Sequence, residues 1–398
     1  MSRRVTCDIL GGKVAPVNCK ISGGGVIPAA YPELIGTAVP QNIIYACRAE
    51  SAGRFFLCTQ TDAFVSVSGG EFTRLNSLAG TSPFLVEEVN GGVPRAVLIN
   101  GANAVAHEGT KFYGVHTGVN LVSGVMRCGR LFAADGENKL MLRWSGEGGI
   151  GDWEQKMSGA GYLLLDPEYG EILGLIAFGE KIIAVRRYGL TGLNAFGNPE
   201  NFSVGITDTR TEEICGGTAA VVCGKLLFYT RSGLRCFDGS RVTPLGHRYS
   251  AEVKNPAFAI SYDGKYYLAC ETGAGRSVLV YDCADGESYI HDIAADGMCA
   301  ADGVCIFNCS GAYRLGEAQS FSFTAEFDFC SGKDKTVTGI FIGGKADIEI
   351  KSGRKTRAFS GASGIIRPKL RGKSFTVKVT GTGVISALTA TAEVLNGI

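Results

Sequence analysis

Two clusters of basic side chains near the C-terminus are the residues best suited to contact a charged partner. They occur in KSGRKTR (351–357) and RPKLRGK (367–373), where glycine and proline favour hairpin loops. Cations spaced in this way can contact nucleic-acid phosphates or the carboxylates of an acidic protein surface, or simply form a solvated face. Only Phe359 and Phe375 accompany them, which disfavours sequence-selective or single-strand recognition by base stacking. The candidate partner-binding residues are Lys351, Arg354, Lys355, Arg357, Arg367, Lys369, Arg371 and Lys373.

Two tryptophans form a second candidate site. Trp144 and Trp153 flank the glycine-rich segment WSGEGGIGDW, which can fold back so that the two rings cover a strand end. Two aromatic rings on one loop could also stack on a sugar. Packing and ligand stacking therefore both stay open for this pair.

Motifs of common hydrolases and metal enzymes do not occur in the sequence. There is no G-x-S-x-G, HExxH, P-loop, sialidase Asp-box or zinc-ligand spacing, and the frequent Asp-Gly pairs fit hairpin turns better than calcium loops. Carboxylates stand near strand ends at Asp62, Asp135, Asp263 and Glu271, but nothing in the sequence indicates that they converge. We therefore expect no catalytic residue, cofactor or metal, and no enzyme activity.

The elements that would position these residues are short strands. Apolar runs of four or five residues recur at 54–58, 95–99, 130–133, 181–185, 225–229, 265–269 and 304–307. Each follows a glycine (Gly53, Gly92, Gly129, Gly179, Gly224, Gly264 or Gly303), and these glycines are 39, 37, 50, 45, 40 and 39 residues apart. A period near 40 with many short strands is typical of a β-propeller.

The runs are apolar at successive positions, as in LLFY (226–229), which predicts strands covered on both faces. A second short strand follows most of them, and no helical periodicity is evident. The sequence therefore predicts an all-β propeller with seven blades favoured over six. A β-sandwich with accidental spacing is the alternative.

The pattern changes at both ends of the chain. From about residue 321 alternating segments such as SFTVKV (374–379) predict strands with one buried face, and hence a small antiparallel β-sandwich. Residues 331–398 contain 12 basic and 4 acidic residues, a net charge of +8, whereas the whole chain is +1. The first 40 residues are rich in Gly and Pro and predict an extended arm. The predicted domains are an arm (1–40), a propeller (41–320) and a basic sandwich (321–398).

Composition limits the class of protein. The 45% of apolar residues can bury a large core, and no apolar run is long enough for a membrane span. The 14 cysteines show no CxxC, and the N-terminus lacks the apolar stretch of a secretory signal. We therefore expect free thiols and folding in a reducing cytoplasm.

The residues also carry a resemblance to a known family. The segment GRLFAADGENKLMLRWS (129–145), followed by Gly-Asp-Trp at 151–153, resembles a strand and loop of phage and prophage propeller proteins. EILGLIAFGEKIIAVRR (171–187) is similar to their next blade. RPKLRGKSFTVKVTGTG (367–383) with ISALTA (385–390) resembles the β-sandwich that closes some of them. The similarity covers about residues 125–245 and 320–390.

This resemblance implies a virion structural protein of the tail or head–tail connector, assembled in the host bacterial cytoplasm. Its partners would be other virion proteins, including further copies of itself, and no catalytic residues come with the family. A propeller that binds carbohydrate or a host receptor is the alternative function, and a propeller glycoside hydrolase is a less favoured one.

Overall fold

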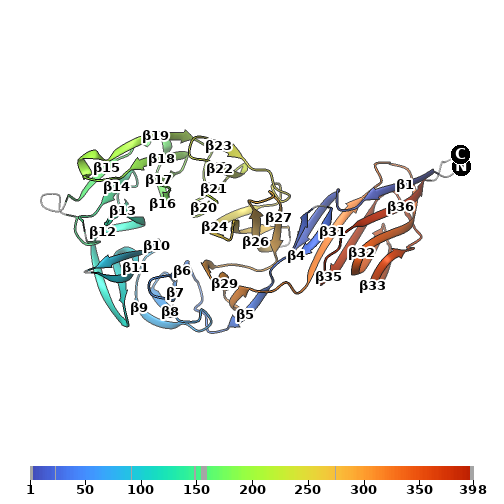
Figure 1. The fold of residues 1–398 in the computed structure, drawn as a ribbon, viewed down its shortest axis with the longest axis horizontal. Coiled ribbons are helices and arrows are strands. Elements are labelled where there is room, and N and C mark those ends of the chain that lie inside the picture. Colours follow the sequence, from blue (N-terminus) through green and yellow to red (C-terminus); the bar gives the residue numbers. More distant parts are fainter. Residues whose placement is uncertain are drawn as a thin grey trace.

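The structure is a computed structural model that describes residues 3–22, 24–90, 92–147, 149–153, 159–273 and 275–394. The described chain is all-β, with two short 3-10 turns and no α-helix. Antiparallel sheets are arranged around a ring, which is a β-propeller (Figure 1). A second β unit extends from one side of the ring, and both chain termini lie at its far end (Figure 1).

Five blades of the ring have four strands each. The first consists of β6 (Tyr45–Ala49), β7 (Arg54–Cys58), β8 (Asp62–Ser66) and β9 (Thr73–Ser77). A second blade consists of β16 (Ile172–Phe178), β17 (Lys181–Arg186), β18 (Gly189–Asn194) and β19 (Ser203–Arg210). A third consists of β20 (Ala220–Val222), β21 (Lys225–Thr230), β22 (Gly233–Phe237) and β23 (Val242–Pro244). The next is β24 (Lys254–Tyr262), β25 (Lys265–Thr272), β26 (Gly275–Asp282) and β27 (Ser288–His291). The last is β28 (Gly297–Ala301), β29 (Gly303–Asn308), β30 (Gly311–Leu315) and β5 (Pro32–Gly36).

A six-stranded sheet completes the ring between the β6–β9 and β16–β19 blades. Its order is β10 (Pro83–Asn90), β11 (Val93–Glu108), β12 (Lys111–Arg127), β13 (Arg130–Asp135), β14 (Met141–Trp144) and β15 (Gly161–Leu164). Register shifts interrupt the two long strands at Gly101/Asn103 and Leu121/Ser123. The first half of β11 therefore pairs with β10 and its second half with the first half of β12. The second half of β12 pairs with β13.

The recurring glycines stand in the turns that the sequence predicts. Gly129 and Gly224 both have a φ of 72°, and the preceding Cys128 and Cys223 have φ values of 48° and 49°. Two successive residues with positive φ form the type of hairpin turn whose twist matches that of the flanking strands. Glycine adopts this conformation without a steric penalty, so the repeat is explained by local backbone geometry.

The strands after these glycines are buried on both faces, as expected. All six residues of β13 and all six of β29 are buried. Strand β29 is the second strand of its four-stranded blade, and β13 lies between β12 and β14 in the six-stranded sheet. The first strand of each blade faces the central opening, whereas the second lies between neighbouring blades.

Residues 3–22 and 24–36 form five strands, and not the extended arm predicted for residues 1–40. The strands β1 (Arg3–Asp8) and β2 (Lys13–Val17) pair with strands from the C-terminal end of the same chain, and β3 (Cys19–Ser22) pairs with β4 (Gly25–Pro28). Strand β5 then pairs with β30 and supplies the outer strand of the last blade. Because Gly- and Pro-rich segments can also form short edge strands, composition alone cannot distinguish them from a free arm.

The second β unit, which we call the terminal β body, contains β1–β4 and six strands from the C-terminal end of the chain. These are β31 (Phe321–Phe327), β32 (Lys335–Ser352), β33 (Lys355–Ile366), β34 (Leu370–Gly372), β35 (Phe375–Gly381) and β36 (Leu388–Val394). One continuous core joins the two chain ends, with Ile9 and Ile21 packed in the same cluster as Phe323, Val377 and Leu388. A single bridge, Val17 with Ile290, connects the main sheet of this unit to the ring.

Candidate functional site

The two predicted basic clusters meet at one end of the terminal β body. The first cluster surrounds the hairpin between β32 and β33, and the second surrounds β34. A Cβ atom on Gly372 would lie 1.8 Å from the Ser352 hydroxyl oxygen, so the two loops touch. The Ser352 hydroxyl also donates a 2.8 Å hydrogen bond to the carbonyl oxygen of Ser374.

This end of the unit is the one farthest from the ring. Lys335 and Arg3 both lie opposite Val394 in the sheet, so the start of β32 is next to the chain termini. Gly372 lies opposite Lys335 on the other side, which places the second cluster there as well. Figure 1 shows the termini at the far end of the molecule. We call this region, defined by the eight predicted basic residues, the basic end.

The side chains of the basic end are available to a partner. All eight basic residues are exposed. Ion pairs with Glu349 (2.6 Å) and Asp334 (3.3 Å) engage Lys351 and Arg371. Within the described part of the chain, the other six make no ion pair. The structure adds the exposed residues Arg3 and Arg4, which sequence reasoning missed because only strand pairing brings the N-terminus here.

A buried lysine holds the loops of the basic end in place. The side chain of Lys335 is 0% exposed and its ammonium donates to three backbone carbonyls, those of Asp328, Ser331 and Lys373 (2.7 Å to the last). Backbone carbonyls are the partners that a buried ammonium needs in place of water. This contact joins the loop before β32 to the loop after β34, so it constrains the backbone at Lys373 in the second cluster. Nothing in the sequence distinguishes Lys335 from the exposed lysines around it, because its burial depends on strand pairing.

The tryptophan pair is packed into the ring. Trp144 donates from Nε1 to the carbonyl oxygen of Gly159 at 3.1 Å, and its ring meets Phe202 edge to face with centroids 5.3 Å apart. Trp153 packs against a different core cluster that includes Ile150. The two side chains therefore have separate packing environments, and their positions do not support a shared stacking platform.

The four carboxylates that the sequence analysis considered lie in separate parts of the ring. Asp62 accepts a 2.8 Å hydrogen bond from Arg74 Nε, and Asp135 is paired with Arg143. The Asp263 carboxylate lies 3.3 Å from Lys265 Nζ, and Glu271 accepts from Asn255 Nδ2 at 2.8 Å. Each carboxylate is thus held by a neighbour in its own sheet. Among the residues that the structure describes, no group of three or more His, Cys, Asp or Glu side chains could hold a metal ion.

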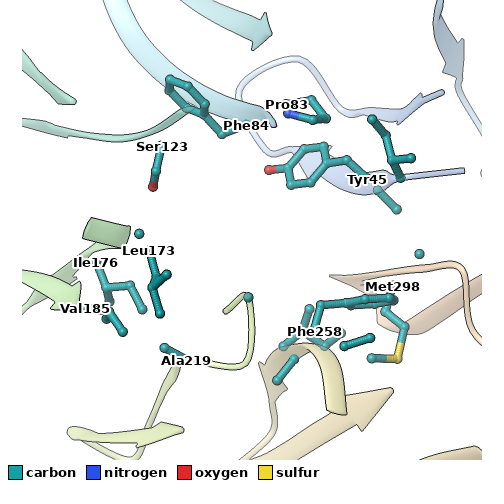
Figure 2. Close-up of a pocket in the computed structure, with 18 of the residues that line it drawn as sticks. Tyr45, Pro83, Phe84, Ser123, Leu173, Ile176, Val185, Ala219, Phe258 and Met298 are labelled. Carbon is teal, nitrogen blue, oxygen red and sulfur yellow. The ribbon is translucent and has the colours of Figure 1, made fainter. Parts of the chain in front are cut away.

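The central opening of the ring is mainly apolar. It contains a cavity of about 420 Å³, and Figure 2 shows Tyr45, Phe84, Leu173, Ile176, Phe258 and Met298 around it. The carboxylate in its lining is that of Asp296, which forms a 2.5 Å ion pair with Arg276. This lining can exclude water, but it does not assemble an acid and a base.

Comparisons with known proteins find no relative by sequence. No family model matches the chain, and no curated protein matches it. No helix in the described residues is long and apolar enough to cross a membrane.

Three solved structures are similar to the chain at low sequence identity. One is the Pan2 WD40 domain of Neurospora crassa, with 8% identity and a TM-score of 0.45, covering 72% of this chain and 92% of that one. Another is the extracellular domain of a one-component system of B. thetaiotaomicron, with 8% identity, a TM-score of 0.49 and coverage of 88% and 58%. PorZ, a surface component of the type-IX secretion system of Porphyromonas gingivalis, has 9% identity, a TM-score of 0.48 and coverage of 89% and 58%. Scores at this level carry no argument about function.

Proposed function

We propose that the protein is a non-enzymatic structural component of a phage virion, located in the tail or at the head–tail connector. In this proposal the propeller is a rigid scaffold, and the basic end contacts an acidic surface on a neighbouring virion protein. The observation that carries the proposal is the gathering of eight exposed cations at one end of an elongated molecule, beside the backbone that Lys335 anchors at Lys373. Clustered charge of one sign attracts a surface of the opposite sign and orients the encounter.

The sequence resemblance supports the same role. Segment 129–145 contains β13 and β14, and segment 171–187 contains β16 and β17, which follow β13 and β14 around the ring. Segment 367–383 contains β34 and β35, next to the basic end. The resemblance thus covers neighbouring structural units.

We also infer that the ring has seven blades. Five have four strands each, and the six-stranded sheet divides at its two register shifts into two further units. In this division β10, the two halves of β11 and the first half of β12 form one blade. The second half of β12 with β13–β15 forms the other. For the terminal β body we infer a two-layered sandwich, since β32 pairs with β36 before Gly343 and with β35 after Gly344.

Particle composition tests the virion role. Particles from the host culture would be purified on a density gradient and analysed by quantitative mass spectrometry. We expect this chain at a constant ratio to the tail proteins. Its absence from particles that contain the other tail proteins would contradict the proposal.

Charge reversal at the basic end tests the proposed contact. We expect Arg354→Glu combined with Lys355→Glu to lower incorporation into particles roughly tenfold, equivalent to about 1.4 kcal/mol of contact free energy. The control is Lys225→Glu with Lys254→Glu, which makes the same charge change at exposed positions on the ring. Equal incorporation of the two double variants would exclude the basic end as the contact.

A further inference from the structure

Two cysteines lie opposite each other in the last blade of the ring. Strands β28 and β29 are antiparallel, and Cys299 is paired directly with Cys305. Both thiols point towards the blade formed by β6–β9, where they join a core cluster with Ala46 and Phe55. Opposite residues of antiparallel strands have Cα atoms about 4.5–5.5 Å apart, within the range of about 4.4–6.8 Å that a disulfide requires.

A row of side chains extends from this pair across the sheet. Arg314 on β30 lies opposite Cys305, and Glu33 on β5 lies opposite Arg314. In the sheet, Cys305 thus has Cys299 as its partner on one side and Arg314 on the other, and both lower the pKa of its thiol. Cys305 is therefore placed between a second thiol and a cation.

A second guanidinium approaches from the neighbouring blade. Arg48 on β6 contributes its positive charge to the surroundings of both thiols. Its Nη1 atom also forms ion pairs with Glu50 (3.4 Å) and Asp302 (3.8 Å). Among the described residues, the Nε atoms of Arg48 and Arg314 are both buried without a hydrogen-bond partner. Two guanidinium groups near the thiols, each with an Nε atom that lacks a hydrogen-bond partner, favour the thiolate form.

We propose that Cys299 and Cys305 form an oxidisable dithiol that hydrogen peroxide converts into an intrachain disulfide. The Cys305 thiolate attacks one peroxide oxygen, so an S–O bond forms, the O–O bond breaks and hydroxide leaves. This hydroxide takes up the proton that the Cys305 thiol released and becomes the first water. Cys299 then attacks the Cys305 sulfur and loses its proton, which leaves with the displaced hydroxide as water. Two thiols and one peroxide thus become one disulfide and two waters.

The electrostatics support Cys305 as the attacking thiol. The hydrogen bond with Cys299 and the contact with Arg314 lower the pKa of the Cys305 thiol, whereas the hydrogen bond with Cys305 together with burial raises the pKa of Cys299. The thiolate is the nucleophile in such reactions, so the two cysteines have distinct roles. Cys299 and Cys305 are only 4% and 0% exposed, which favours a small oxidant over a bulky disulfide.

Peptide mapping tests this proposal on the full chain. Asp302 stands between the two cysteines, so cleavage before aspartate separates Cys299 (peptide 296–301) from Cys305 (peptide 302–327). After treatment with hydrogen peroxide, we expect these peptides to be joined and to separate again on reduction. Cys309 is exposed and lies in the same peptide as Cys305, so the Cys309→Ser variant removes ambiguity and should keep the cross-link.

Variants then test the mechanism. We expect Arg314→Gln to slow cross-link formation several-fold, and Cys299→Ser to leave Cys305 as a sulfenic acid that a dimedone probe labels. Wild-type protein whose other thiols are oxidised while peptides 296–301 and 302–327 stay separate would overturn the proposal. A cross-link from Cys305 to Cys47 in place of Cys299 would also overturn it.

Discussion

Lys335 is a buried cation that the basic end depends on. Replacing it by methionine keeps most of the side-chain volume but leaves three backbone carbonyls without their donor. Each unsatisfied buried carbonyl costs about 1–3 kcal/mol, and partial access of water lowers the total for the three carbonyls. We therefore expect Lys335→Met to reduce the free energy of unfolding by roughly 2–4 kcal/mol. Urea denaturation measures this change. Lys333→Met, at an exposed position in the same loop, is the control and should change stability by less than about 0.5 kcal/mol.

Two histidines, the buried His291 and the half-buried His247, make the fold sensitive to mild acid. Burial lowers the pKa of His247 and of His291 to about 4, from an ordinary value of about 6.5. Between these values the unfolded chain binds protons that the folded chain does not. The free energy of unfolding therefore falls as the pH drops from about 6.5 to about 4, by at most about 1.4 kcal/mol per pH unit for each histidine.

Urea denaturation across this pH range measures the effect. The double variant His247→Gln with His291→Gln should have a flatter profile between pH of about 6.5 and 4.5. If its slope equals that of the wild type, the histidines are not the source of the acid sensitivity.

At the scale of elements, β5 completes the last blade through a very close contact. A Cβ on Gly36 would lie 1.9 Å from the carbonyl oxygen of Gly70, and one on Gly70 would lie 2.4 Å from the carbonyl oxygen of Ile35. Only residues without a side chain allow β5 to lie against this turn, because the obstructing atoms are backbone. The contact ties the last blade to the first.

We expect Gly36→Ala to weaken this closure. The added methyl group forces the backbone apart, at a cost of about 1–3 kcal/mol, and should speed amide hydrogen exchange in β30. Gly246→Ala is the matched control, because no atom lies within 4 Å of a Cβ at that position. Exchange in β30 that stays at the wild-type rate in Gly36→Ala would show that β5 does not depend on this contact.

At the scale of the whole molecule, the N-terminal segment belongs to both units. Strands β1 and β2 pair with β36 and β31 in the terminal β body, and β5 pairs with β30 in the ring. The same segment supplies Ile9, Leu10 and Val14 to the core of the terminal β body. The two ends of the chain therefore stabilise each other.

Deletion of residues 1–36 tests this dependence. We expect the truncated chain to lose cooperative unfolding of the terminal β body and to expose the edge of β30, with aggregation as the visible result. A peptide of residues 3–36 added in trans should partly restore solubility. A truncated chain that melts like the full chain would contradict the assignment of these strands to the two units.

The sequence alone determined the features that arise from local backbone geometry and from alternation. Positive φ at a tight turn requires glycine or a similarly tolerant residue, so Gly129 and Gly224 mark hairpins that the structure contains. Burial on both faces requires continuous apolar runs, so strands such as β13 and β21 were predicted within one or two residues. The hairpin at the first basic cluster follows from the same local signals, since glycine interrupts the charged run there and the structure pairs β32 with β33 around it.

Only the tertiary structure decided which distant strands pair. An alternating pattern specifies which face of a strand is buried, but it contains no information about the partner strand. The pairing of β1 with β36 and of β5 with β30, the burial of Lys335 and the meeting of the two basic clusters all depend on such partners. The same holds for Cys299 and Cys305, whose reactivity depends on an arginine from the next strand and another from the neighbouring blade.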